Sequence, residues 1–255
     1  MSKYLEKYKY ATPDLTDSHT VECGATPEFA MFFQLPRQQR SRLNEDRILY
    51  ERLFKKWEQF ESSGTYVEMG AFDGHTESNS RFFDICLGWN GLLVEGNPSS
   101  YAKVLKARPH AHRMSFAPSC SAEYEVENKT IEFYKYPMAN SGLIGQALTY
   151  QGKPTVDVPC GPLAPVLQDI FENERINFFS LNVEGAEPMI LETIDFDKVL
   201  IEVMMIEVQN NHCRGNCESR QRVRAKMEKE GYRRYEHVVA ASDIYIHPNS
   251  RYQLD

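Results

Sequence analysis

Short apolar runs recur along the chain and alternate with longer segments in which apolar and polar positions are mixed. The runs at 65–70, 91–96 and 199–209 have the length and composition of buried strands. Apolar positions three or four residues apart predict amphipathic helices at 41–60 and 98–107. Further helices are predicted at 75–88, 163–174 and 218–230, and further strands at 111–117 and from 178. Strands that alternate with helices predict an α/β fold, a parallel sheet with helices on both faces.

The C-terminal part changes this pattern. Residues 232–239 and 242–248 both read as strands, and only a few residues separate them. A parallel connection needs a crossover of a dozen or more residues, so these two strands cannot be parallel neighbours. The sheet is therefore predicted to be mixed, with an antiparallel strand at its C-terminal edge.

The chain is predicted to divide into an N-terminal arm and one domain. Residues 1–40 show no clear period and are expected to form an extended arm, followed by a domain over 41–255 with its core at 65–247. Alternation around Asn128 predicts a hairpin, and the glycine-bearing stretch that follows is expected to be a mobile loop. Both belong to an insertion at about 120–155.

Charge and hydropathy restrict the class of partner. The chain has 255 residues and a formal net charge of −7, so nucleic acid is not an expected partner. No run of 18 uncharged apolar residues is present, and the first residues lack the apolar region of a signal peptide. A cytoplasmic location is expected, with the secretory pathway as the alternative if an N-terminal anchor is missing.

The six cysteines are scattered, so reduced surface thiols or at most one local disulfide are expected. Cys213 and Cys217, with His212 beside them, come closest to a metal pair, but zinc needs about four ligands and no second pair is present. No metal is therefore expected. The even number of cysteines and the sequon at Asn128 also fit a protein of the secretory pathway.

The first polar cluster follows the strand at 65–70. Gly70 and Gly74 permit a tight turn, but the spacing is E-x-G-x-x-x-G and not the G-x-G-x-x-G of dinucleotide sites. Glu68 and Asp73 add negative charge where a pyrophosphate needs neutral or positive surroundings, which favours a ligand with a cationic part. Taken alone, the cluster is also compatible with an ordinary strand–helix turn.

The next strand ends at Glu95, a position from which a carboxylate can accept hydrogen bonds from both hydroxyls of a ribose. The alternative is a solvated loop acid. Together with the glycine turn on the neighbouring strand, Glu95 favours an adenosine cofactor without a large phosphate group, namely S-adenosylmethionine.

Two further places in the sequence, one of them a strand–helix junction, carry candidates for binding the methyl acceptor. In "FFSLNVEGAEPMIL" (178–191), Asn182, Glu184 and Glu187 lie where a strand meets a helix that begins near Pro188. They are candidates to bind substrate or take up a proton, although acids at a helix start are also favoured by the helix dipole. Glu207, late in an apolar strand, is costly to bury without a partner and is a further candidate.

The order of these motifs resembles the FkbM-type methyltransferase family, including its Star-like branch. The motifs are "YVEMGAFDGHTES", "GLLVEGNPSSYAKVLKA", "SGLIG", "VPCGPLAPVL" and "FFSLNVEGAEPMIL" followed by "MMIEV". The resemblance implies a Rossmann-like class I methyltransferase with a mixed seven-stranded sheet whose last strand is antiparallel. By similarity, the methionine end of S-adenosylmethionine is expected to bind at Glu68, Gly70, Ala71, Asp73 and Gly74. Its ribose is expected at Glu95 and Asn97, and its adenine at Ser115, Phe116 and Ala117.

The chain departs from the family pattern at two positions. Asn182 stands where the family usually has aspartate, and "EGNP" replaces "EPNP". An amide keeps hydrogen-bonding geometry but cannot act as a base. The hypothesis is methyl transfer to an oxygen of a small-molecule or glycan-like acceptor, with Asn182, Glu184, Glu187 and Glu207 as the candidate catalytic residues. The alternatives are an inactive binding or trafficking module, which Asn182 motivates, and a nicotinamide-dependent oxidoreductase, which the missing phosphate loop disfavours.

Overall fold

The computed structural model describes most of the chain. The described residues are 3–14, 23, 29–57, 64–120, 129–147, 150–172, 175–208 and 217–254. In this part of the chain, no helix is long and apolar enough to cross a membrane.

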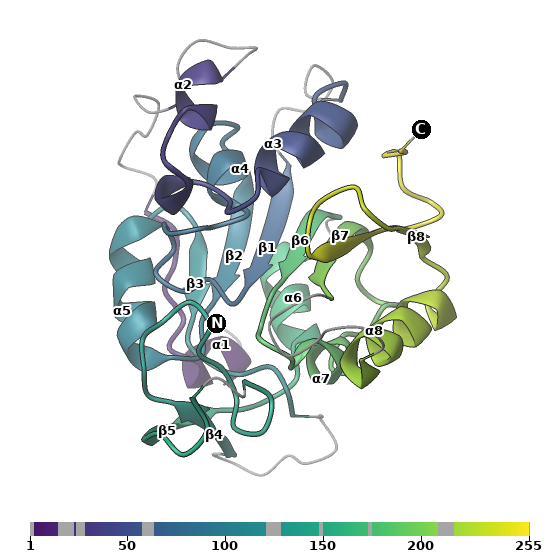
Figure 1. Ribbon diagram of the computed structural model, residues 1–255. Helices are drawn as coiled ribbons and strands as arrows, with labels where there is room; N and C mark the ends of the chain where they lie inside the picture. Colours follow the sequence, from purple (N-terminus) through teal and green to yellow (C-terminus); the bar gives the residue numbers. More distant parts are fainter. Residues whose placement is uncertain are drawn as a thin grey trace.

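A seven-stranded sheet forms the centre of the molecule (Figure 1). Its order is β3-β2-β1-β6-β7-β9-β8, and a separate ladder pairs β4 with β5. The strands are β1(Thr65–Met69), β2(Asn90–Val94), β3(His112–Met114), β4(Thr130–Tyr134), β5(Thr155–Pro159), β6(Ile176–Leu181), β7(Ile201–Glu207), β8(Arg233–Tyr235) and β9(Ser242–Ile246). Five adjacent strands of this sheet, β3, β2, β1, β6 and β7, are parallel, so their carboxyl ends lie at one edge of the sheet.

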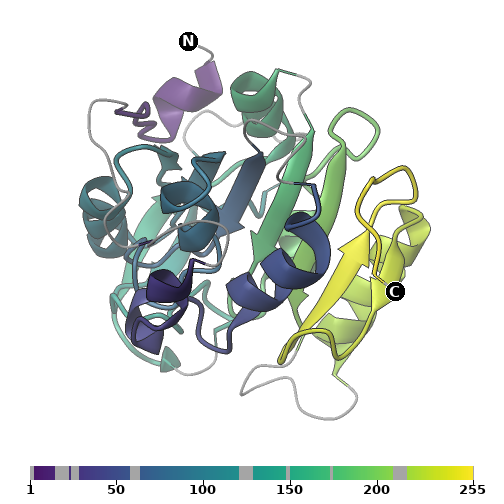
Figure 2. The same cartoon turned by 90° about the horizontal axis from the view of Figure 1, so that it is seen from above.

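Helices cover both faces of this sheet (Figure 2). One apolar cluster joins the sheet to α1, α6, α7 and α8, and a second joins it to α2, α3, η3, α4 and α5. The helices are α1(Lys3–Lys7), α2(Ala30–Phe33), η2(Arg37–Gln39), α3(Glu45–Leu49), the π-helical turn η3(Tyr50–Phe54), α4(Arg81–Ile85), α5(Pro98–Ala107), α6(Ala164–Phe171), α7(Glu187–Leu191) and α8(Glu218–Lys229). The fold is therefore the predicted α/β sandwich of three layers.

The mixed sheet is confirmed, and the position of its antiparallel strand is now defined. β9, the last strand of the chain, runs antiparallel to β7 and to β8. It lies between them, one position in from the edge that β8 forms. The C-terminal strand pair thus extends the parallel sheet without a crossover helix.

The helix predicted at 75–88 is shorter than expected, because α4 begins only at Arg81. Carboxylates of Asp73 and Glu68 hold the preceding residues in a loop by accepting hydrogen bonds from the backbone N–H groups of Thr76 and Asn79. Polar side chains that bond to nearby backbone compete with helix formation in this way.

The insertion contains a two-stranded ladder, and its strand β4 lies in the second half of the hairpin predicted around Asn128. That residue lies outside the described part of the chain. β4, which follows it, pairs antiparallel with β5, so the described partner of β4 lies about 25 residues further on. The loop between the two strands passes back over β4, where Phe133 and Leu143 form an isolated bridge.

The described residues of the predicted N-terminal arm contain short helices and pack into the core. Tyr8, Phe29 and Phe32 are fully buried. Ala11 forms an antiparallel bridge with Arg113 in β3, through hydrogen bonds of 2.9 and 3.1 Å. The segment thereby covers the outer edge of β3, an edge that otherwise exposes unpaired backbone groups.

The expectation of reduced thiols or at most one local disulfide is wrong. Cys23 is bonded to Cys86 and Cys120 to Cys160, across sequence separations of 63 and 40 residues. Cys217 is also disulfide-bonded, so it is no metal ligand. Scatter along the sequence does not oppose pairing, because the fold brings distant segments together. Cys213 and His212 lie outside the described residues.

Candidate functional site

The loop after β1 is shaped by its two glycines. Gly70 and Gly74 have φ angles of +78° and +76°, in the region that favours glycine. A Cβ on Gly70 would lie 2.0 Å from the carbonyl oxygen of Asn182. The loops after β1 and β6 therefore touch, and this contact is possible only because residue 70 has no side chain.

Glu68 connects the end of β1 to residues 78–80 by hydrogen bonds. Its carboxylate accepts hydrogen bonds from Ser78 Oγ at 2.7 Å, Asn79 N at 2.7 Å and Ser80 Oγ at 2.6 Å. Ala71 is buried in the same loop. Asp73 accepts from the backbone N–H groups of His75 and Thr76. The predicted acids thus lie at the expected turn, and the bonds they make within the chain shape it.

A buried arginine that sequence reasoning missed completes this support. Arg108 is 0% exposed, pairs with Asp84, and donates to Tyr66 Oη at 2.8 Å and Ser80 Oγ at 3.1 Å. Its Nη1 lies 3.8 Å from Glu68. The surrounding anions and hydroxyls raise its pKa despite the opposing effect of burial. No local signal marks this residue, because its partners come from elements far away in the sequence.

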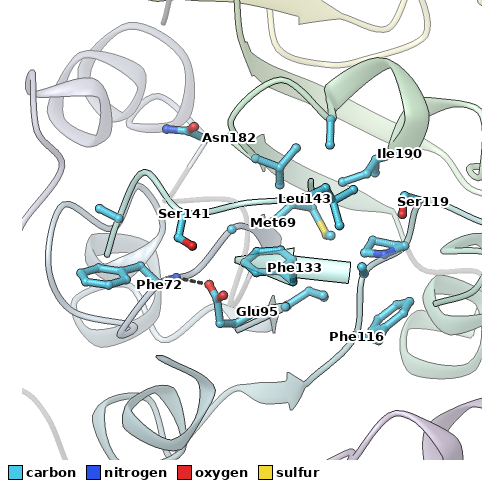
Figure 3. Close-up of a pocket in the computed structure, with 18 of the residues that line it drawn as sticks. Met69, Phe72, Glu95, Phe116, Ser119, Phe133, Ser141, Leu143, Asn182 and Ile190 are labelled. Carbon is cyan, nitrogen blue, oxygen red and sulfur yellow. Dashed lines mark hydrogen bonds between the residues drawn. The ribbon is translucent and has the colours of Figure 1, made fainter. Parts of the chain in front are cut away.

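Glu95 lies at the end of β2 with both oxygens held. It accepts a hydrogen bond of 2.7 Å from Phe72 N (Figure 3) and another of 2.7 Å from Asn97 N. Burial raises the pKa of Glu95 to about 7, against the lowering effect of these bonds. Asn97 caps α5 through Ser99 N, and its amide donates to three carbonyl groups of the insertion, those of Tyr134, Lys135 and Tyr136. The loop after β2 therefore binds both the glycine turn and the insertion.

A mainly apolar pocket lies between Glu95 and the loop after β6 (Figure 3). Its walls come from β1 and β2, from the segment after β3, from the insertion and from α7. The lining includes Met69, Gly70, Phe72, Glu95, Phe116, Ala117, Ser119, Phe133, Ser141, Leu143, Asn182 and Ile190. Two of the three predicted adenine residues, Phe116 and Ala117, line it. The third, Ser115, is buried and donates its backbone N–H to the carbonyl oxygen of Tyr8.

A second, polar cleft of about 800 Å³ adjoins this pocket. The two share Met69, Gly70, Phe72, Met138, Ala139 and Asn182 in their walls. The rest of the cleft lining comes from β1 and the loop after it, the segment that leads into α3, the loop before α4, the insertion, the loop after β6, the end of β7, α8 and the start of β9. Its charged residues are Arg42, Glu45, Glu68, Glu77, Glu184, Glu207 and Arg220.

The four candidate catalytic residues are not all placed alike. Asn182, Glu184 and Glu207 line the cleft. Burial and the charge of Glu187 together raise the pKa of Glu184 to about 7, against the lowering effect of Arg42. Glu187 is 1% exposed and accepts from Val183 N and Gly185 N, so its carboxylate stabilises the turn and lines neither cavity.

Several lining residues were not found from the sequence. Phe133, Met138 and Leu143 come from the insertion, and Arg42 comes from the loop before α3. The insertion was expected to be mobile because of its glycines. The lining residues of the insertion could be found only by knowing that β4 pairs with β5, because this pairing places the intervening loop over the pocket.

The strand order and the paired cavities at the carboxyl ends of the parallel strands define a Rossmann-like methyltransferase fold. A family model described as the methyltransferase FkbM domain matches residues 68–234, well over half of the chain. The chain belongs to the FkbM-domain methyltransferase family, and its cofactor is S-adenosylmethionine. A comparison with curated protein sequences finds no match.

Solved structures of methyltransferases are similar to this chain at low sequence identity and with TM-scores below 0.5. Fibrillarin from Aeropyrum pernix, with natively bound S-adenosyl-L-methionine, is 7% identical with a TM-score of 0.42, covering 72% of this chain and 66% of its own. A TehB-like S-adenosylmethionine-dependent methyltransferase from Corynebacterium glutamicum is 9% identical, with a TM-score of 0.38 and coverages of 80% and 88%. A methyltransferase from Aquifex aeolicus is 8% identical, with a TM-score of 0.36 and coverages of 79% and 96%. No inference about the methyl acceptor follows from these similarities.

Proposed function

We propose that this chain transfers a methyl group to an oxygen of a small-molecule or glycan-like acceptor. The observation that carries this proposal is the junction of two cavities at Gly70, Phe72, Met138 and Asn182. One cavity is narrow and mainly apolar, which suits an adenosine, and the other is wide and polar, which suits a hydroxyl-bearing acceptor. When bound, S-adenosylmethionine supplies a methyl group on a cationic sulfur.

The residues of the narrow pocket fit this cofactor. Glu95 presents a carboxylate whose two bonds to Phe72 N and Asn97 N leave lone pairs for ribose hydroxyls. Phe116 and Ala117 provide apolar walls for the adenine. Gly70 and Asn182 line both cavities, so the methionine end would lie beside the glycine turn at this junction.

Glu184 is the candidate general base. Because its pKa is raised to about 7, it is partly ionised at neutral pH and can take a proton from an acceptor hydroxyl. Asn182 lies at the junction and can orient the acceptor by hydrogen bonds, while Arg42 and Glu207 line the cleft further out. Glu187 is assigned the supporting role of holding the turn at Val183 and Gly185.

The second candidate function is a binding module that retains the fold without turnover, and Asn182 favours it. An amide at this position cannot serve as a base. Glu184 favours the enzyme, because it places a carboxylate of raised pKa in the same cleft.

Calorimetric titration with S-adenosylmethionine tests cofactor binding directly. We expect saturable binding to one site, and its absence at millimolar ligand contradicts the methyltransferase. Methyl transfer is then measured with a labelled methyl group across a panel of hydroxyl, sugar and amine acceptors. Binding without transfer to any acceptor supports the binding module.

The variant Asn182→Asp separates the two functions further. If the amide orients the acceptor in a working enzyme, the substitution leaves cofactor affinity unchanged and lowers or preserves the rate. A gain of methyl transfer from an inactive wild type shows instead that a catalytic acid had been lost. Asn140→Asp, in the same cleft but away from the junction, is the matched control.

The disulfides bear on the compartment in which this chemistry takes place. We infer an oxidising compartment, because two disulfides that join distant segments persist poorly where glutathione keeps thiols reduced. Alkylation of the denatured, unreduced protein from its native source should leave Cys23, Cys86, Cys120 and Cys160 unmodified. Full alkylation of these four cysteines would contradict the oxidising compartment and support a cytoplasmic location.

A further inference from the structure

The adenine side of the pocket receives its support from a segment far away in the sequence. Phe116 lines the pocket (Figure 3) and is 0% exposed. The ring of Tyr8 stacks on it with centroids 4.2 Å apart and an angle of 6° between the planes. Tyr8 is 1% exposed and lines no part of the pocket, so it supports the Phe116 ring from outside.

The backbone of the same segment holds the same wall. The carbonyl oxygen of Tyr8 accepts a hydrogen bond of 3.0 Å from Ser115 N, one residue before Phe116. Three residues later, Ala11 pairs with Arg113 through two backbone hydrogen bonds. Tyr101 Oη also donates to the carbonyl oxygen of Lys9. Both the strand that leads to the wall and the wall itself are therefore tied to residues 8–11.

The hydroxyl end of Tyr8 is in turn confined by Gly161. A Cβ on Gly161 would lie 1.7 Å from Tyr8 Oη and 2.8 Å from its Cζ. Gly161 follows Cys160, which is bonded to Cys120 just beyond the pocket wall. The tyrosine ring thus fills the space between the wall and this turn and cannot move away without displacing one of them.

We propose that Tyr8 is a positioning residue for the adenosine end of the cofactor, and that residues 8–11 support the wall of the cofactor site from outside the pocket. The proposal rests on the proposed placement of the cofactor in the apolar pocket. Face-to-face support fixes the plane of Phe116, and a wall of fixed orientation loses less freedom when a ligand packs against it. Loss of this support lowers affinity without removing any atom that touches the ligand.

The test measures affinity for S-adenosylhomocysteine by calorimetry in Tyr8→Leu, Tyr8→Phe and Tyr10→Ala. Tyr8→Leu keeps a buried apolar side chain but loses the stacked ring, and should weaken binding about two- to tenfold, the scale of one aromatic pair. Tyr8→Phe keeps the ring and should bind like the wild type. Tyr10 belongs to the same segment and its hydroxyl bonds to His112 in β3, so Tyr10→Ala controls for general loosening.

A second measurement does not depend on Tyr8 substitutions that disturb folding. In Gly161→Ala the added Cβ would collide with the hydroxyl end of Tyr8, so this variant should also weaken binding. Adding Tyr8→Phe removes the nearest atom and should restore part of the loss. Amide hydrogen exchange at Ser115 in the ligand-free protein should speed up in Tyr8→Leu and in Gly161→Ala.

The outcomes separate this inference from the proposed function. If the wild type binds no S-adenosylhomocysteine, the proposed function fails and this inference with it. If the wild type binds and Tyr8→Leu binds as tightly, only the inference is overturned. Equal losses in Tyr8→Leu and Tyr10→Ala, or a double variant no better than Gly161→Ala, overturn it as well.

Discussion

Two glutamates with similarly raised pKa values lie on either side of the junction, and their surroundings differ. In the apolar pocket, both oxygens of Glu95 are fixed by backbone N–H groups of Phe72 and Asn97. In the polar cleft, the side chain of Glu184 makes no hydrogen bond among the described residues, and its pKa reflects burial and the charges of Glu187 and Arg42. A fixed carboxylate suits binding of a ligand that never changes, whereas an unfixed one suits proton exchange with a variable acceptor.

The same contrast holds for the walls around them. The pocket is lined by apolar side chains of the core and the insertion, such as Phe116, Phe133 and Leu143. The cleft is lined largely by loops, and one of these loops carries Leu43, which is 40% exposed. The pocket is therefore determined by the fold, and the cleft by loops that can differ without disturbing the core.

The largest effect is expected from Glu184→Gln. If Glu184 is the base, the substitution should lower kcat by about 10²–10⁴ and leave the affinity for S-adenosylhomocysteine within about twofold. In the wild type, kcat should rise with pH through about 7 as Glu184 loses its proton, and the variant should lose this rise.

Glu187→Gln is the matched control for this variant, because it alters a neighbouring carboxylate that holds the turn. It should lower the melting temperature and retain the rise of kcat with pH, displaced to lower pH because the charge of Glu187 no longer raises the pKa of Glu184. Retention of that pH dependence in Glu184→Gln would remove Glu184 from the chemistry and leave the cleft with a binding role only.

A smaller effect is expected from Gly70→Ala, which attacks the contact that joins the two cavities. A Cβ there meets the carbonyl oxygen of Asn182, so one loop has to shift, and a misplaced site of this kind costs about 10² in kcat/KM. Gly88→Ala carries the same positive-φ penalty, with φ at +65° and no atom within 4 Å of the added Cβ.

Thermal denaturation and calorimetry of both variants separate backbone strain from the clash. Gly88→Ala should lose about 1–2 kcal/mol of stability with unchanged cofactor affinity. Equal loss of affinity in the two glycine variants would mean that strain alone, and not the contact with Asn182, explains the effect.

The pocket could be predicted from the sequence better than the cleft, and the reason is physical. Gly70, Glu95 and the turn at 182–187 follow strands that the apolar pattern reveals, and parallel strands bring their carboxyl ends together whatever else the chain does. Glu68 was found at its position, but its bonding to Ser78 and Ser80 depends on a loop where a helix was expected.

The remaining parts depend on contacts between distant segments. Tyr8 and Arg108 act through partners from several elements, and no local pattern marks either residue. The disulfides were missed for the same reason, since Cys23 and Cys86 are 63 residues apart. Periodicity reports which face of an element is buried and carries no information on which distant element covers it.

The smallest effect, about tenfold, is expected from the ionisation of Glu95. The fold raises its pKa from 4.5 to about 7, so the ligand-free protein should lose stability as the pH rises through this window. Ribose hydroxyls donate to the ionised form, so the affinity for S-adenosylhomocysteine should instead increase, by about tenfold between about pH 6 and pH 8. Calorimetry across this range should show the increase in the wild type and in Glu184→Gln, but not in Glu95→Gln. An increase that disappears in Glu184→Gln and persists in Glu95→Gln would exchange the roles of the two carboxylates, placing the binding charge in the cleft.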